Sequence, residues 1–183
     1  METQVRTFYQ TSKGFKVFTI FGYATKGIPS LEINGAGKLS KNIKEKLIFL
    51  TRNRKLNIPH RRFVICIDQN DDIDNDEVLL KWLEFPLLLT YWYLAGLVPI
   101  GRLENCFCSG WIKPNGEIFH FPLNERQEQI LSKGLPAAER DRVLFIGKND
   151  SSIDAQMLLE HIPNLQFHYD YHTHKKELLA MTS

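Results

Sequence analysis

The feature that most constrains this chain is an apolar stretch near its middle, within the segment Leu83–Pro99, which reads LEFPLLLTYWYLAGLVP. Every residue from 87 to 95 except Thr90 is apolar, a pattern typical of a helix that is buried on nearly all sides. A membrane span needs about 20 consecutive apolar residues. The stretch is too short for that, so the sequence predicts a central core helix.

The two ends of this helix carry recognisable signals. Pro86 suits the first helical turn, where its missing N–H costs nothing. Gly96 favours the end of the helix, with Pro99 three residues further on. We therefore expect the carboxylate of Glu84 at the positive end of the helix, where a negative charge is stabilised.

The rest of the chain alternates between strand and helix patterns. β-branched and aromatic runs predict strands at 15–23, 30–33, 63–67, 106–112, 117–121, 142–147 and 165–169. Helices are expected from Ser40, from Asn124 with Gln127 at capping-box spacing, from Ser151 or Ser152, and from His174. This order predicts an α+β fold with a mixed sheet, as one domain over 15–183 preceded by an N-terminal arm over 1–14.

Composition excludes little beyond this. The 183 residues are 43% hydrophobic and carry a net charge of +2, so bulk charge favours neither nucleic acid nor a membrane surface. The N-terminus lacks an apolar signal core, and three cysteines make an odd count. We expect a cytoplasmic protein with reduced cysteines.

Five segments in succession resemble one known domain. They are KGIPSLEINGAG, the following helix, NIPHRRFVICIDQND, LEFPLLLTYWYLAG and CFCSGWIKPNGEIFHFPL. The succession is similar to the N-terminal, magnesium-chelatase ChlI-like domain of the ComM/YifB family. The resemblance spans about residues 15 to 180. It implies the fold of the Lon protease proteolytic domain, also called ribosomal protein S-five domain-two-like.

The resemblance also implies a lost reaction. Lon-type peptidases use a Ser at the start of the core helix and a Lys after the hairpin, because a hydroxyl needs a base to become a nucleophile. Glu84 occupies the Ser position here, and residues 122–127 contain no Lys. We therefore expect no enzymatic activity. ComM-type proteins also continue into an ATPase module, which carries a phosphate-binding loop. The similar-looking segment GAGKLS at 35–40 lacks the residue spacing of such a loop, so we expect no nucleotide or other cofactor.

A basic segment offers a different function. Nine Lys or Arg residues lie between 38 and 62, against a single acid, Glu45. Such a face could contact phosphates, or it could be an ordinary solvated helix face. The candidate nucleic-acid-binding residues are Lys41, Lys44, Arg52, Arg54, Lys55, Arg61 and Arg62.

Two other constellations are weaker. His168, Asp170, His172 and His174 alternate and would share one face of a strand, as metal ligands could, but a helix expected from His174 would break the alternation. Ser109 and His120 could act as a nucleophile and its base, but no third orienting group is visible. The acidic loop 68–77 fails both calcium-loop registers.

Three hypotheses follow. The first is a non-catalytic, stand-alone relative of the ComM N-terminal domain that acts as an assembly or interaction module, through self-association or with a separate ring ATPase, within DNA processing. The second is a nucleic-acid-binding accessory domain that uses the basic segment. The third is a Lon-like serine peptidase remnant.

Overall fold

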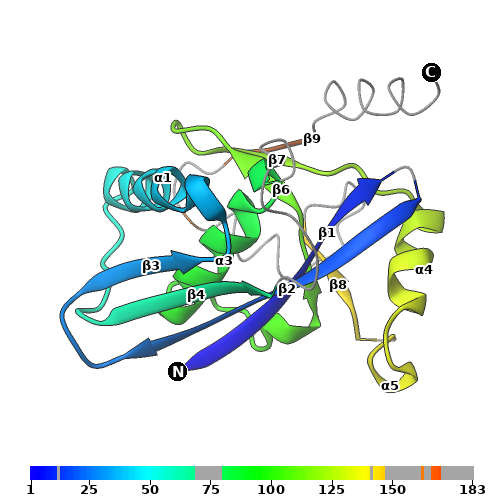
Figure 1. Ribbon diagram of the computed structural model, residues 1–183, viewed down its shortest axis with the longest axis horizontal. Helices are drawn as coiled ribbons and strands as arrows, with labels where there is room; N and C mark the ends of the chain where they lie inside the picture. Colours follow the sequence, from blue (N-terminus) through cyan, green and yellow to red (C-terminus); the bar gives the residue numbers. More distant parts are fainter. Residues whose placement is uncertain (12, 69–79, 141, 147–161, 163–165, 170–183) are drawn as a thin grey trace.

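A computed structural model describes residues 1–11, 13–68, 80–140, 142–146, 162 and 166–169 of the chain (Figure 1). Its main sheet has six strands in the order β3-β4-β2-β1-β5-β8. These strands are β1 (Glu2–Thr11), β2 (Gly14–Thr25), β3 (Ser30–Asn34), β4 (Arg62–Asp68), β5 (Cys106–Phe107) and β8 (Leu144–Phe145). A smaller sheet has the order β6-β7-β9, with β6 (Gly110–Ile112), β7 (Glu117–His120) and β9 (Gln166–Tyr169).

Both sheets are mixed. In the main sheet, β2 is antiparallel to both of its neighbours, β1 and β4. The other three pairs, β3–β4, β1–β5 and β5–β8, are parallel. In the small sheet β6 and β7 are antiparallel, and β7 and β9 are parallel. The prediction of an α+β fold with a mixed sheet is confirmed.

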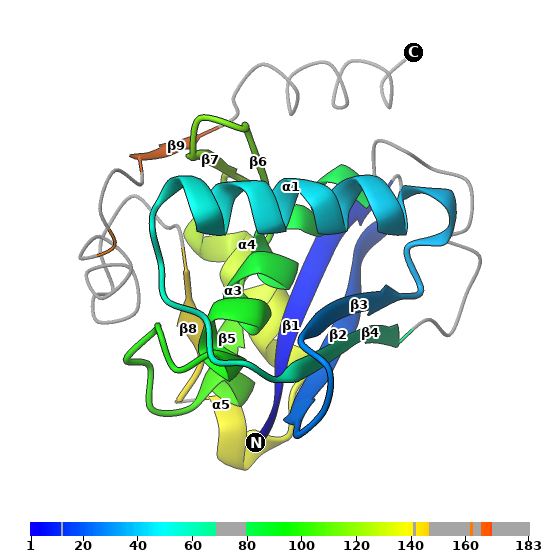
Figure 2. The ribbon, with the colours of Figure 1, turned by 90° about the vertical axis from the view of Figure 1, so that its left-hand side faces the viewer.

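Two helices lie on one face of the main sheet (Figure 2). α3 (Glu84–Leu94) is the core helix, and Phe85, Leu88 and Trp92 are each at most 1% exposed. α1 (Ser40–Asn53) lies outside it and turns an apolar stripe inward, formed by Ile43, Leu47 and Leu50. This stripe has the helical spacing expected from the sequence.

A second apolar cluster lies apart from this core. It joins β1 and β5 to α4 (Glu125–Lys133) and the segment after it. Its buried members are Phe8, Trp82, Phe107, Phe121, Leu131 and Leu135. α4 begins with the predicted capping box, in which the Asn124 and Gln127 side chains each accept from the other residue's backbone N–H. Short elements complete the described fold: η1 (Gly37–Leu39), η2 (Leu103–Asn105) and α5 (Ala137–Arg140).

The prediction of a separate arm over 1–14 is wrong. Residues 2–11 form β1, which pairs with β2 on one side and β5 on the other. Val5 is fully buried in the main core and Phe8 is buried in the second cluster. The N-terminal residues are therefore an interior part of the sheet.

Two local predictions also need correction. The single strand expected at 106–112 is divided, because Cys106–Phe107 pairs with β1 while Gly110–Ile112 pairs with β7. Ser40 does not cap α1; Leu39 is the N-cap residue, without a side-chain bond. The helices expected from Ser151 or Ser152 and from His174 lie outside the described residues.

Candidate functional site

The start of α3 holds a largely buried ion pair between Glu84 and Lys46. Glu84 is the first residue of α3 and only 6% exposed. One carboxylate oxygen lies 2.5 Å from Nζ of Lys46 on α1, and the other accepts the backbone N–H of Ile112 on β6 at 2.9 Å. Lys46 also donates to the Ile112 carbonyl at 3.2 Å. The pair thereby joins α1, α3 and β6.

This geometry revises the expected role of Glu84. The sequence placed its carboxylate among the free N–H groups of its own helix, but α3 has no side-chain cap bond. Its partners come instead from β6 and from Lys46, which sequence analysis counted only as one of nine basic residues. The sequence does indicate that Lys46 faces partly inward, because it lies three residues after Ile43 and four before Leu50 and so borders the apolar stripe of α1.

Ser109 and His120 lie at the nearby hairpin. Their side chains are 2% and 1% exposed, and the His120 ring packs edge-on against Phe85, with centroids 5.0 Å apart. His120 pairs with Gly110, the residue after Ser109, so along the ladder Ser109 and His120 point to opposite faces. A substrate carbonyl would have to open the core to reach either one.

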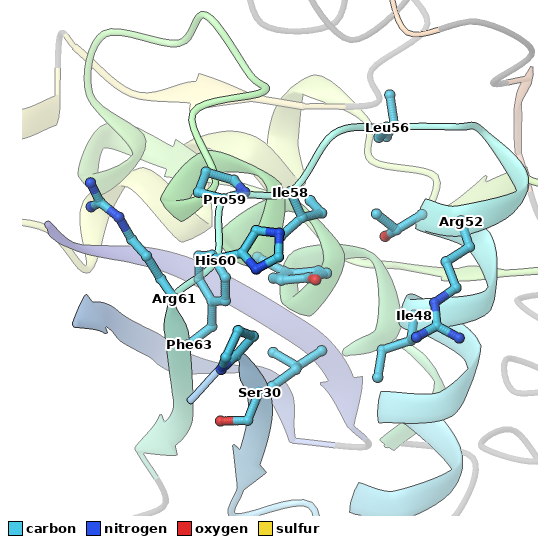
Figure 3. A pocket seen from close by; sticks show the side chains of 13 residues that line it. Ser30, Ile48, Arg52, Leu56, Ile58, Pro59, His60, Arg61 and Phe63 are labelled. Atoms are coloured by element: carbon cyan, nitrogen blue, oxygen red, sulfur yellow. The ribbon is translucent and has the colours of Figure 1, made fainter. Parts of the chain in front are cut away.

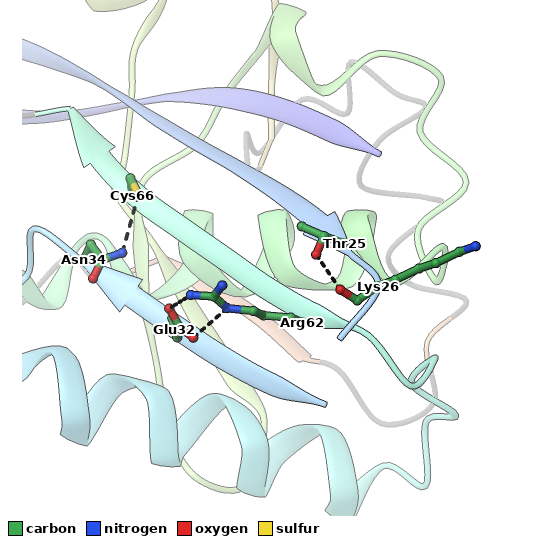
Figure 4. Close-up of polar contacts among 6 residues, drawn as sticks. All are labelled: Thr25, Lys26, Glu32, Asn34, Arg62 and Cys66. Atoms are coloured by element: carbon green, nitrogen blue, oxygen red, sulfur yellow. Dashed lines mark hydrogen bonds and ion pairs between the residues drawn. The ribbon is translucent and has the colours of Figure 1, made fainter. Parts of the chain in front are cut away.

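Of the seven candidate cations, two are bonded to protein oxygens, four are exposed without such a bond among the described residues, and Lys44 is half-buried. Arg54 donates to the Asn115 carbonyl, and Arg62 forms two 2.9 Å hydrogen bonds with Glu32 across the β3–β4 pair (Figure 4). The Arg62 hydrogen bonds, with a smaller contribution from the charge of half-buried Lys44, lower the pKa of the Glu32 carboxyl. The four exposed cations without a described side-chain partner are Lys41, Arg52, Lys55 and Arg61.

A cavity of about 280 Å³ lies beside this exposed group (Figure 3). It is bordered by the C-terminal half of α1, the start of β3 and the connecting segment 56–61. Tyr91 on α3 lines the cavity. Burial raises the pKa of its phenol, and this effect outweighs the positive charge of Arg52, which lowers the pKa. The hydroxyl therefore stays protonated and able to donate at neutral pH. Sequence analysis missed this cavity because its lining comes from four separate segments.

The proposed metal ligands fall mostly outside the described residues. His168 lies in β9, whereas Asp170, His172 and His174, like residues 69–77 of the acidic loop, are not among those the structure describes. In the described part of the chain, no three His, Cys, Asp or Glu residues are grouped so as to hold a metal ion. Likewise, none of the described helices has the length and apolar character needed to cross a membrane.

Comparison with known proteins assigns no family. The chain matches no protein-family model, and a search of curated proteins gives no match.

Proposed function

We propose that this protein is a non-catalytic interaction module of the cytoplasm, related to the ComM N-terminal domain, that assembles with itself or with a partner such as a separate ring ATPase. The observation that carries the proposal is the pairing of Glu84. A carboxylate held 2.5 Å from Lys46 and bonded to Ile112 is a charge-neutralised structural contact, and it occupies the position at which this family resemblance would otherwise place a nucleophile.

The order of the elements supports the family relationship. β3, α1, β4, α3 and the β6–β7 hairpin follow one another as the five resembling segments do. The Asn115-Gly116 turn between β6 and β7 occurs where the hairpin was predicted, and Gly116 has a φ of +94°, which suits glycine.

The outer face of β2 supplies a surface for assembly. Phe18 and Ile20 face the main core, and the alternate residues Val17, Phe21 and Tyr23 are 46%, 42% and 41% exposed. β2 is an interior strand, so its backbone is already paired on both edges. A partner would therefore bind these side chains face to face and would not add a strand. Two aromatic rings on one face are the kind of anchor that interfaces favour.

Two measurements test this proposal together. We expect no labelling by a fluorophosphonate serine probe and no casein cleavage. We also expect light scattering to give a multiple of 21.3 kDa, with Phe21→Ser shifting the mass toward the monomer. Ile130→Ser is the matched control, because Ile130 on α4 is 50% exposed against 42% for Phe21, and it should leave the mass unchanged. Probe labelling, or a monomer that engages no protein, would contradict the proposal.

The exposed cations favour a second candidate, a nucleic-acid-binding accessory domain. All four are exposed: Lys41 and Arg52 lie on α1, Lys55 follows the helix, and Arg61 directly precedes β4. If this candidate is correct, duplex DNA or RNA should bind with an affinity that falls steeply with salt. Charge reversal of Arg52 and Lys55 should then abolish binding to every sequence tested.

A further inference from the structure

The cavity beside α1 combines an apolar interior with a positive rim. Ile48, Ile58 and Phe63 supply apolar surface, and the rings of Phe63 and Tyr91 meet edge to face with centroids 5.2 Å apart. Phe63 and Tyr91 are buried, whereas Ile48 and Ile58 are half-buried. The interior is therefore preformed by the core, and its outer wall is open to a ligand.

The lining contains basic side chains and no acidic one. Arg52 and His60 lie on opposite sides of the cavity, and the Arg61 side chain extends away from it (Figure 3). No Asp or Glu belongs to the lining. The described structure shows no ion pair for these three side chains, in contrast to Arg62, which Glu32 neutralises, and Arg54, which the Asn115 carbonyl engages. The fold thus leaves positive charge at this opening.

Two exposed apolar residues are sequence neighbours of residues that line the cavity. Ile28 is 87% exposed and directly precedes Pro29, which lines the cavity. Phe49 is 54% exposed, follows the lining residue Ile48, and lies one helical turn before Arg52. Exposed apolar residues next to a lining offer contact beyond what a small metabolite would use, and such residues are typical of a protein-binding site.

We propose that this cavity binds an acidic segment of a partner protein, with one bulky apolar side chain entering between α1 and segment 56–61. Carboxylates on either side of that side chain face Arg52 and His60, and the Tyr91 hydroxyl donates a hydrogen bond at the inner end. This inference rests on the proposed function, because it specifies how the interaction module recognises a partner. The surface is distinct from the outer face of β2.

The observations favour a protein segment over nucleic acid. A phosphate backbone would use the cations and leave the apolar interior, Ile28 and Phe49 without a role. A cavity of about 280 Å³ is small for a complete ligand but sufficient for a single apolar side chain.

The test uses the full chain and short fluorescein-labelled peptides. The probe is Glu-Asp-Phe-Asp-Glu, compared with the same peptide carrying a central Gly and with one carrying Lys in place of each acid. Fluorescence anisotropy should show that the Phe peptide binds about tenfold or more tightly than the Gly peptide. The basic peptide should not bind.

Two variants locate the binding. Arg52→Glu should weaken binding of the Phe peptide about tenfold. Lys41→Glu is the matched control, because it makes the same charge change on an exposed residue of the same helix and lies outside the cavity lining. Ile58→Trp should weaken binding by filling the cavity, and circular dichroism melts verify that each variant is folded.

Any of three results would overturn the inference. Equal weakening by Lys41→Glu and Arg52→Glu would show attraction to net charge alone. Equal binding of the Phe and Gly peptides would show that the cavity is not used. Displacement of the peptide by duplex DNA or RNA, with the same dependence on Arg52, would assign the surface to nucleic acid. None of these results would alter the serine-probe or mass measurements, so the two proposals fail separately.

Discussion

Replacing Lys46 by Met should destabilise the protein strongly, although the residue lies on the outer helix. The substitution keeps the aliphatic chain and removes the ammonium 2.5 Å from Glu84. Breaking a buried ion pair by removing one partner costs about 3–5 kcal/mol, because the other charge stays buried without compensation. The Lys46 side chain is 26% exposed and the Glu84 side chain 8%, so water can partly replace the ammonium. We therefore expect a loss of about 3 kcal/mol in the free energy of unfolding.

A double-mutant cycle separates the pair from other effects. Glu84→Gln alone should cost about 1–2 kcal/mol, because its amide oxygen can still accept the Ile112 N–H while Lys46 turns to water. In the double variant no buried charge remains, so it should be more stable than the sum of the single losses predicts, by about 2 kcal/mol.

Urea unfolding followed by tryptophan fluorescence measures each value, since Trp82 and Trp92 are buried at 2% and 1% exposure. All variants are compared at one protein concentration, because association would add to apparent stability. Lys41→Met on the exposed side of α1 is the control and should change stability by less than about 0.5 kcal/mol. If Lys46→Met costs less than about 1 kcal/mol and the two substitutions are additive, the pair is not a structural clamp.

Four further predictions follow from buried groups. Burial raises the pKa of Cys106 from 9.0 to about 12, and that of Cys108 well above its ordinary value; a thiol reagent should therefore modify half-buried Cys66 first. Between pH 9 and about 12 the thiol of Cys106 ionises in the unfolded chain but stays protonated in the folded protein, so the free energy of unfolding should fall as the pH rises through this range. A urea midpoint that does not change between pH 9 and 12 would refute this expectation. Thr51→Val removes the acceptor 2.9 Å from the Trp92 indole N–H and should cost about 1–3 kcal/mol by urea unfolding, whereas Thr51→Ser, which keeps the acceptor, should cost less. Gly110→Ala would bring a Cβ within 2.6 Å of the Phe119 carbonyl oxygen and should cost about 2 kcal/mol or more, whereas Gly101→Ala, with nothing within 4 Å, should be nearly neutral by thermal melting.

The sequence predicted the core helix well, because its signal is local and strong. A nine-residue apolar stretch, a Pro in the first turn and a Gly at the end left few alternatives, and α3 spans Glu84–Leu94. The capping box at Asn124 was equally predictable, since both partners lie within four residues. The Lon-like relationship stays a prediction.

β1 escaped prediction for a physical reason. Its two large apolar residues, Val5 and Phe8, are three apart and therefore point to opposite faces, into two different clusters. Val5 shares its face of the strand with Thr3 and Thr7, which are buried although they are polar. The usual alternation of apolar and polar residues is consequently absent.

The site was predicted only in part. Glu84 was singled out because its position in a helix start is visible in the sequence. Its partner Lys46 lies 38 residues away, and no sequence rule joins two residues on different elements. The same limit applies to the cavity, because its Arg52, His60 and Tyr91 come from α1, the segment 56–61 and α3, which only the tertiary fold brings together.

The pairing of β1 with β5 has a consequence for synthesis on the ribosome. β1, β2 and β4 are complete once residue 68 has emerged, but the second edge of β1 pairs through Arg6 with Phe107. At about 5–20 residues per second, that edge stays unpaired for roughly 2–8 seconds after β4 is made. An open edge beside Phe8 is a template for pairing with another chain. The nascent chain is therefore most prone to aggregate in this interval, and slowing translation between residues 68 and 107 should lower the yield of soluble protein.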